Sequence, residues 1–296
     1  MTSLTQPNEP DRQVVAAARS AAWRRNLRRM LRNPSLVTGG VILFVFFVVA
    51  ILANVLAPYG GNAQDILHVL QRPSWAHPFG TDSIGRDIFS RVILGTRYSL
   101  SIAVLSVAIG AVIGIPVGLV AGYFGGRLDS WLMGFIDILL TIPVIVLAIA
   151  IVTVIGPGMV GLVVAISITF APRLARITRG RVFEVKEEVY VSAAQALGGT
   201  TRRVMTRHVL PNSFAPLIIE ITLRAGQAVL VGAALGFLGL GVQPPTPEWG
   251  TMLSRGRDYL QLARFVVIAP GIAISLLVLG FNLFGDGLRD IWDPNG

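Results

Sequence analysis

The chain of 296 residues is 53% hydrophobic and only 14% charged, and its mean hydropathy is +0.67. This composition excludes an ordinary soluble globular domain and predicts a membrane protein. The net charge of +9 comes from arginines at the ends of apolar runs, which indicates membrane topology rather than nucleic acid binding. The absence of cysteine excludes disulfides, thiolate metal sites and cysteine nucleophiles.

Six apolar runs predict an all-α, polytopic membrane fold with six transmembrane helices. We expect the spans at residues 38–57, 98–123, 131–155, 159–175, 213–241 and 265–285. The chain then divides into a cytosolic N-terminal segment (1–37), the first span with an external interfacial segment (38–97), a core of five spans (98–285) and a cytosolic C-terminal tail (286–296).

The external segment after the first span ends in a stretch of mixed character. Residues 82–97 predict a capped amphipathic helix lying at the membrane interface. Its apolar side would carry Ile84, Ile88 and Val92, and its polar side Arg86 and Arg91. His77 and Asp82 are too few ligands for a metal site, so a surface turn is favoured there.

Small and charged residues mark the second, third and fourth spans. A stripe recurring every fourth residue in the second span predicts close packing of another helix: Gly110, Gly114, Gly118 and Gly122. A carboxylate inside the third span is costly, so Asp137 is expected to be paired or to anchor the helix, with a wet path as the alternative. Four arginines are expected to close the fourth span: Arg173, Arg176, Arg179 and Arg181.

The fifth span carries an acid and a base four residues apart. Glu220 precedes Arg224, an order that favours an internal ion pair, and a gate or substrate contact is the alternative interpretation. The segment that follows is rich in proline and glycine and predicts an irregular external loop as far as Arg264.

Between the fourth and fifth spans, residues 184–211 predict two short helices joined at a glycine. Apolar residues at helical spacing form a narrow stripe that another surface could approach: Tyr190, Ala193, Ala194 and Leu197. Gly198 follows directly and is expected to take the left-handed conformation that closes a helix. Thr200 can cap the second helix, and Pro211 is expected to end it before a new cap at residues 212–213.

The distribution of basic residues predicts the orientation. With the amino terminus inside, seventeen arginines and lysines face the cytosol and seven face the exterior. Lys and Arg prefer the cytoplasmic side, so the segment 184–211 is expected there.

Several of these blocks resemble one family. The run Ser192-Ala193-Ala194, then Gly198, then His208-Val209-Leu210-Pro211 resembles the EAA loop of bacterial ABC importer permeases, although Ser192 replaces the usual glutamate and His208 an isoleucine. The ending His-Val-Leu-Pro-Asn is similar to that of peptide permeases. Residues 77–87, 236–250 and 282–290 resemble the same family, so the likeness covers nearly the whole chain.

The resemblance implies the type I ABC importer permease fold in a bacterial plasma membrane, with a coupling helix in the segment 184–211. It implies contacts with an ATPase subunit at Tyr190, Ser192, Ala193, Ala194, Leu197, Gly198, Arg203, His208, Leu210 and Pro211. It places an external loop near a binding protein at Gln243, Pro244, Glu248 and Trp249.

The implied partners are a homologous B-type permease, ABC ATPase subunits that hold ATP and Mg, an extracytoplasmic substrate-binding protein, the lipid bilayer and a di- or oligopeptide substrate. Nickel chelates or other peptide-like solutes are the alternative cargo. ATPase closure would move the element around Gly198 and tilt the adjoining spans.

The chain carries no motif for chemistry of its own. It has no phosphate-binding loop, and Lys186 is its only lysine, so we expect no ATPase site, no catalytic residue and no cofactor. A proton-coupled secondary transporter with Asp137 or Glu220 as carrier is the rival interpretation. A membrane scaffold is a third.

Overall fold

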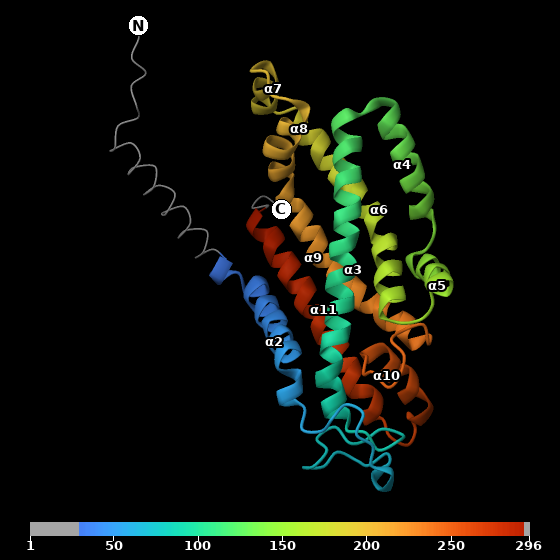
Figure 1. Ribbon diagram of the computed structural model, residues 1–296. Helices are drawn as coiled ribbons and strands as arrows, with labels where there is room; N and C mark the ends of the chain where they lie inside the picture. Colours follow the sequence, from blue (N-terminus) through green and yellow to red (C-terminus); the bar gives the residue numbers. More distant parts are fainter. Residues whose placement is uncertain (1–29, 293–296) are drawn as a thin grey trace.

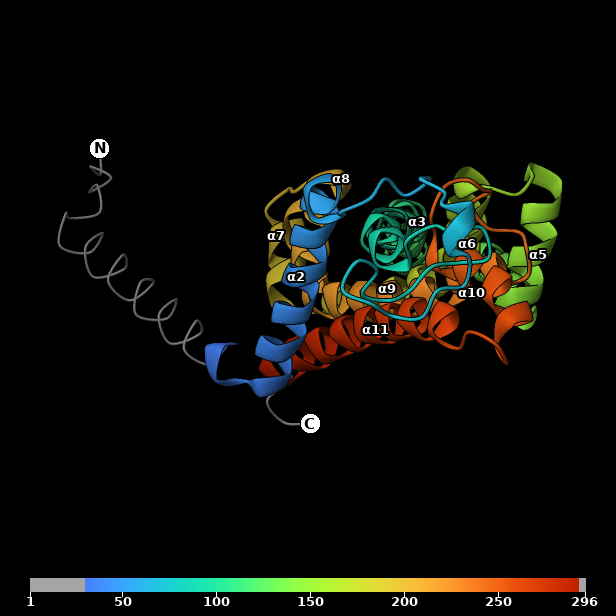
Figure 2. The same ribbon diagram turned by 90° about the horizontal axis from the view of Figure 1, so that it is seen from below.

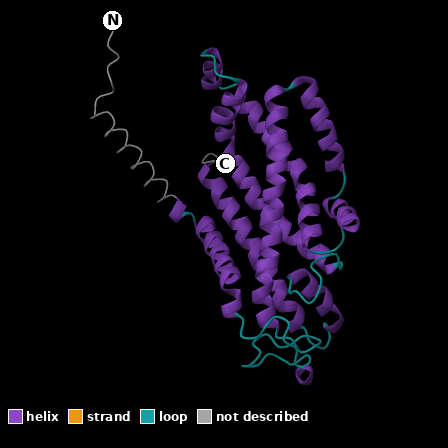
Figure 3. Cartoon of the chain, viewed as in Figure 1, coloured by secondary structure: helices purple, strands orange, loops and turns teal. Residues whose placement is uncertain are grey.

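The computed structural model describes residues 30–292, and every regular element among them is a helix. The expected cytosolic segment 1–37 therefore lies mostly outside the described residues, as does the tail beyond residue 292. Figure 1 shows long helices side by side, with α7 and α8 at one end of the bundle and α10 near the other. We call these the α7 end and the α10 end. Loops collect at the α10 end (Figure 3).

Five described helices are long and apolar enough to cross a membrane, and a bent pair gives a sixth crossing if it is one span. The long helices are α2 (Pro34–Leu56), α3 (Ile88–Phe124), α6 (Met159–Lys186), α9 (Leu210–Phe237) and α11 (Phe265–Trp292). The shorter ones are α4 (Gly126–Thr141), α5 (Val144–Ile155), α7 (Val189–Ala196), α8 (Thr201–Val204) and α10 (Trp249–Gly256). Single turns cover Ile66–His68, Met205–Val209 and Arg257–Tyr259. The all-α polytopic fold is confirmed.

The predicted continuous span 131–155 is wrong, because α4 and α5 meet at an angle of 94°. Pro143 lies at the break, and Ile142 before it has an extended backbone with φ −82° and ψ 128°. A residue that precedes proline is disfavoured in the α region, so the helix ends here and restarts in a new direction.

The interfacial helix predicted over residues 82–97 is also wrong. Residues up to Asp87 form a turn, and α3 then runs unbroken for 37 residues from Ile88. The Asp87 carboxylate caps α3 by accepting a hydrogen bond from the Ser90 amide at 2.7 Å. Arg86 and Arg91 are 4% and 3% exposed, so the predicted polar side of that helix faces the interior.

The glycine stripe on α3 is confirmed as a packing surface for α6. A Cβ atom on Gly114 would lie 2.4 Å from the Ala171 carbonyl oxygen, and one on Gly118 would lie 2.2 Å from that of Ala175. These separations are below any real carbon–oxygen contact, so only glycine permits the two backbones to come this close. Figure 2 shows α3 near the middle of the bundle, with α2, α6, α9 and α11 around it.

Two helices run on past the apolar stretches that predict the spans. The fourth span was expected to stop at residue 175, but α6 continues to Lys186. The tail was expected to begin at residue 286, but α11 continues to Trp292. Arg173 therefore lies near the middle of α6 and not at its end.

Arg97 fixes α2 to α3 at the α10 end. Its Nε donates to the Ala50 carbonyl at 2.5 Å, its Nη2 to the Ile51 carbonyl at 2.8 Å and its Nη1 to Asn54 Oδ1 at 2.9 Å. A guanidinium carries five N–H donors, so this one side chain binds two carbonyls and one amide oxygen of α2.

Candidate functional site

The polar segment between α6 and α9 folds into the two short helices that the sequence predicts. Gly198 has φ +80°, so the predicted left-handed conformation is confirmed. Its amide donates to the Gln195 carbonyl at 2.9 Å, and the Gly199 amide donates to the Ala194 carbonyl at 3.0 Å. These two hydrogen bonds close the C-terminal end of α7. Thr200 Oγ1 then accepts from the Arg203 amide at 3.4 Å, which confirms the predicted cap of α8.

Pro211 does not end the second helix, so that prediction is wrong. The helical path from Thr201 continues to Phe237, because a wider π turn over Met205–Val209 precedes the proline. Such a turn changes the hydrogen-bond register and relieves the clash that a proline ring makes with a preceding carbonyl. Residues 212–213 do not cap a new helix. Asn212 Nδ2 instead donates to the His208 carbonyl at 2.6 Å.

Buried aliphatic side chains fix this segment to the bundle. The valine cluster comprises Leu119 from α3, Val182 from α6, Val191 from α7, Val204 from α8 and Val209 from the π turn. The four valines are 0% exposed. Fully burying each aliphatic side chain contributes roughly 1.5–3 kcal/mol, so α7 is held against the ends of three long helices.

The opposite face of α7 is apolar and uncovered. Val189 is 83% exposed, Leu197 is 88% exposed and Tyr190 is 41% exposed. Burial and the neighbouring Glu188 carboxylate raise the pKa of Tyr190, so its hydroxyl stays a neutral hydrogen-bond donor. We call Val189, Tyr190, Ser192, Ala193 and Leu197 the α7 face.

The other residues that the resemblance assigns to this region are distributed around it. Ala194 is half-buried and faces the valine cluster rather than outward, while Arg203 is exposed. His208 and Leu210 are half-buried, and Pro211 is exposed. The structure thus brings the ten predicted positions to one end of the bundle, although their side chains do not share one surface.

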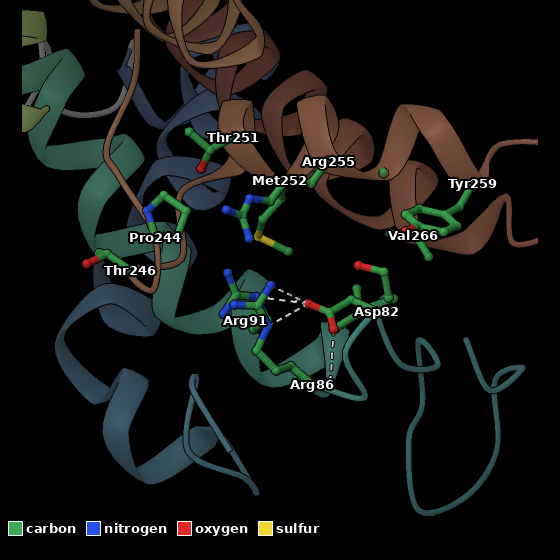
Figure 4. A pocket seen from close by; sticks show the side chains of 13 residues that line it. Asp82, Arg86, Arg91, Pro244, Thr246, Thr251, Met252, Arg255, Tyr259 and Val266 are labelled. Carbon is green, nitrogen blue, oxygen red and sulfur yellow. Dashed lines mark hydrogen bonds and ion pairs between the residues drawn. The ribbon is translucent and has the colours of Figure 1, made fainter. Parts of the chain in front are cut away.

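At the α10 end, Asp82 organises a charged cluster that sequence reasoning treated as a surface turn. Its Oδ2 lies 2.6 Å from Arg86 Nη2 and 3.9 Å from Arg91 Nε, and Figure 4 shows both guanidinium groups facing the carboxylate. Arg91 Nη1 also donates to the carbonyls of Gly61 at 2.5 Å and Pro245 at 3.4 Å. The adjoining cavity measures about 20 Å³, roughly the space of one water molecule.

Two of the four residues expected near a binding protein lie inside the fold. Gln243 and Pro244 are exposed, but Glu248 is 2% and Trp249 0% exposed. Trp249 Nε1 donates to the Val92 carbonyl at 3.0 Å. These two residues therefore hold the loop against α3 and offer no outward contact.

Glu248 is the N-cap of α10. Its Oε1 accepts from the Gly250 amide at 2.7 Å and its Oε2 from the Thr251 amide at 2.9 Å. Burial raises the pKa of Glu248, although hydrogen bonds from Gly250, Thr251 and Ser99 act in the opposite direction. Glutamate is not among the residues that usually cap a helix, so no local signal marked the start of α10.

Three acidic side chains of the bundle pair with arginines. Arg224 Nε donates to Glu220 Oε1 at 2.5 Å, which confirms the predicted ion pair. Asp137 on α4 pairs with Arg176 on α6, and about half of each side chain is exposed. Arg179 forms a two-pronged pair with Asp129, at 2.5 Å for each oxygen, that the sequence did not indicate.

Within residues 30–292, no group of three or more His, Cys, Asp or Glu side chains is arranged to hold a metal ion. His77 contacts a single carboxylate, that of Asp87. The distance from His77 Nδ1 to Asp87 Oδ1 is 2.9 Å.

Comparisons with known proteins identify the fold and the family. Residues 114–295 match the family described as binding-protein-dependent transport system inner membrane component, and residues 22–73 match the N-terminal TM domain of oligopeptide transport permease C. Among solved structures, the MetNI methionine ABC transporter in an inward facing conformation gives a TM-score of 0.58 at 21% identity, covering 69% of this chain and 97% of that chain. An amino acid ABC transporter gives a TM-score of 0.52 at 18% identity, covering 70% of this chain and 95% of that chain.

Three curated relatives extend the likeness to nearly the full length. The dipeptide transport system permease protein DppC of Alkalihalophilus pseudofirmus is 42% identical over 98% of this chain and 95% of its own length. The glutathione transport system permease protein GsiD of Pectobacterium atrosepticum is 42% identical over 92% of this chain and 91% of its own length. The di/tripeptide transport system permease protein DppC of Pseudomonas aeruginosa is 46% identical over 86% of this chain and 87% of its own length. With its helical bundle and its short helices between α6 and α9, the chain belongs to the family of inner-membrane components of binding-protein-dependent transport systems.

Proposed function

We propose that this chain is one permease subunit of an ATP-driven importer for short peptides and that the α7 face docks on a separate ATPase subunit. The α7 face carries the proposal. Leu197 and Val189 are more than four-fifths exposed on a helix whose other side is tied down by the valine cluster. An apolar, rigidly held surface beyond the long helices is suited to a protein partner.

The proposed mechanism follows from helix continuity. Because the π turn keeps α8 and α9 in one helical path, a displacement of α8 reaches α9 without a break in the helix. The valine cluster passes the same displacement to α6 through Val182 and to α3 through Leu119. Movement of the ATPase subunits would then tilt packed helices as bodies and open the pathway alternately to each side.

The orientation and partners are part of the proposal. The α7 end would face the cytosol, where ATP is available, and the α10 end would face a substrate-binding protein in the bacterial exterior or periplasm. A homologous B-type permease would complete the pathway. The bias of basic residues supports this orientation.

Peptides are the proposed cargo because the similar permeases are named for dipeptides, di- and tripeptides and glutathione. A proton-driven mechanism is less suited to the geometry. Asp137 is paired with Arg176, and Glu220 with Arg224, so each carboxylate already has a basic partner within the chain.

The test is association with the ATPase subunit. Leu197→Asp places a charge on the α7 face without touching the valine cluster, and Leu262→Asp is the matched control, because Leu262 is 80% exposed at the α10 end. In mild detergent, we expect Leu197→Asp to lose the co-purifying ATPase and Leu262→Asp to retain it. Retention by both variants would contradict the proposed docking surface.

A further inference from the structure

Two buried arginines at the α10 end lie beside one carboxylate, and that carboxylate is already engaged by one of them. Arg86, Arg91 and Asp82 are each more than nine-tenths buried. Asp82 Oδ1 accepts from the amides of Ile84 and Arg86 at 3.0 Å each, and its Oδ2 accepts from Arg86 Nε at 2.7 Å. Arg91 Nε lies 3.9 Å from the same Oδ2, which is too long for a hydrogen bond. Asp82 therefore neutralises Arg86 and leaves Arg91 without a hydrogen-bonded carboxylate.

Most of the Arg91 guanidinium lacks an acceptor among the described residues. Of its five N–H donors, those of Nη1 are directed to the carbonyls of Gly61 and Pro245. Within residues 30–292, no oxygen accepts a hydrogen bond from Arg91 Nε or Nη2. Carbonyl oxygens carry no net charge, so the two that Arg91 binds do not neutralise it. Because an uncompensated buried charge is costly, this guanidinium requires a counterion.

The cavity next to Asp82 joins these two arginines to a third. Arg86, Arg91 and Arg255 line it, and Asp82 is the one acidic residue among the described residues that do so. In Figure 4 the Arg255 side chain reaches from α10 toward Arg91, close enough for the two charges to repel each other. Three guanidinium groups and one carboxylate leave a surplus charge of +2 around this space.

The neighbouring acidic side chains are occupied elsewhere. Glu248 accepts from amides at the start of α10, and Asp87 accepts from the Ser90 amide at the start of α3. Asp87 also contacts His77. Neither carboxylate lines the cavity, so neither supplies the missing negative charge there.

We propose that this cavity binds one monoatomic anion, for which chloride is the abundant source outside cells. A space of about 20 Å³ admits a single particle of roughly the size of water and excludes phosphate or the carboxylate of a solute. The free donors of Arg91 and the charge of Arg255 hold the ion. The bound ion joins α3 to α10 and completes the neutralisation that Asp82 begins. A water molecule fits the same space but brings no charge, so a test with different salts distinguishes the two.

The test measures the melting temperature of the full chain in detergent while sodium chloride replaces sodium gluconate at constant ionic strength. Gluconate is too large for the cavity. A ligand that binds only the folded state stabilises it increasingly once its concentration exceeds the dissociation constant, so the melting temperature should rise with chloride. We expect Arg255→Gln to shift the onset of this rise to about tenfold higher chloride, since it removes one charged partner of the ion. Arg264→Gln removes an exposed arginine at the same end and should leave the onset unchanged.

Two results would overturn the proposal. Equal melting temperatures in the two salts would show that the cavity holds water alone. A chloride effect that Arg255→Gln leaves unchanged would show that the ion acts at another place. Arg255 is exposed, so its substitution leaves the buried packing of α10 in place.

A charge reversal gives a second and independent readout. Arg255→Glu places a fixed carboxylate at the cavity, where it substitutes for the ion. This variant should melt at the same temperature in both salts, and no lower than the wild type in gluconate, whereas Arg264→Glu should keep the chloride dependence of the wild type. A melting temperature of Arg255→Glu that still rises with chloride would refute the proposal. Neither measurement uses peptide, ATP or a partner subunit, so the result is separate from the test of the proposed function.

Discussion

Val191 of α7 and Val209 of the π turn are both completely buried in one cluster, although the Gly198 turn lies between them in the chain. The turn is therefore clamped on both sides: α7 cannot move without displacing the start of α9. This contact couples any movement of the short helix α7 to the bundle. The backbone conformation of Gly198 then sets the direction of α7 relative to α8.

Gly198→Val should uncouple ATP hydrolysis from uptake while the protein remains in the membrane. A Cβ atom at this position meets nothing within 4 Å, so the cost comes from the backbone at φ +80°. For a residue with a side chain this conformation costs roughly 1–2 kcal/mol, and more when the residue is β-branched. The variant complex is assayed for ATPase activity and peptide uptake. Gly180→Val is the control, since Gly180 also has open space around it but lies in regular α6. Normal uptake by Gly198→Val would refute the role of this turn.

Gly118→Leu should prevent α3 and α6 from packing. A Cβ alone would lie 2.2 Å from the Ala175 carbonyl oxygen and 2.6 Å from Thr178 Cβ, and neither can yield without separating the helices. We expect loss of monodisperse protein on size-exclusion chromatography in detergent. Gly134→Leu on α4 meets nothing within 4 Å and should behave like the wild type. Equal behaviour of the two variants would show that the close approach is not needed.

Arg97→Gln should release α2 from α3 at the α10 end. The substitution removes three hydrogen bonds from a charged donor, which we expect to cost about 1–3 kcal/mol of stability. The apparent melting temperature and the protease sensitivity of the loop after α2 report the effect. Arg72→Gln, an exposed position at the same end, is the control and should change neither.

Stability should depend on pH through Glu248. Because burial raises its pKa above the ordinary value of 4.5, the folded protein holds this proton more tightly than the unfolded chain. The corresponding stability is present below the unfolded pKa and is lost as the pH rises through the folded pKa. We therefore expect the melting temperature of Glu248→Gln to rise relative to the wild type as the pH increases from 4.5. The exposed control Asp258→Asn should show no such trend. A difference in melting temperature between Glu248→Gln and the wild type that stays constant with pH would contradict the assignment.

Local patterns in the sequence sufficed for features that depend on neighbouring residues alone. The left-handed Gly198, the Thr200 cap and the pairing of Glu220 with Arg224 each involve groups within a few residues of one another. The α3 glycine stripe was also predictable, because a spacing of four places small residues on one helix face whatever packs against it.

Prolines show why the remaining structure was not predictable. Pro143 breaks a span and bends the chain by 94°, whereas Pro116 and Pro172 lie inside continuous helices. Pro211 follows a π turn that no local signal marked. Each ring removes one amide donor, and whether a helix continues depends on packing by residues distant in the sequence.

Arg173 illustrates the same limit on α6. A group of arginines after an apolar run indicates the end of a span, but α6 continues to Lys186 because Val182 is buried in the valine cluster. The extension moves Arg173 from an expected boundary to the middle of the helix, beside Glu220. The burial of Glu248 and Trp249 likewise depends on contacts with α3 that no spacing in the loop indicates.

The most direct test of the account is site-specific cross-linking from the α7 face. Ala193→Cys gives the full transporter a single thiol in this chain, which lacks cysteine, at an exposed position beside Leu197. A short thiol-to-amine cross-linker applied to inside-out vesicles should join this chain to the ATPase subunit, and Thr153→Cys, exposed on α5, should not be joined to it. Absence of the adduct from Ala193→Cys, or labelling of that thiol from the external side of intact cells, would contradict the central claim that α7 is where the ATPase engages the permease.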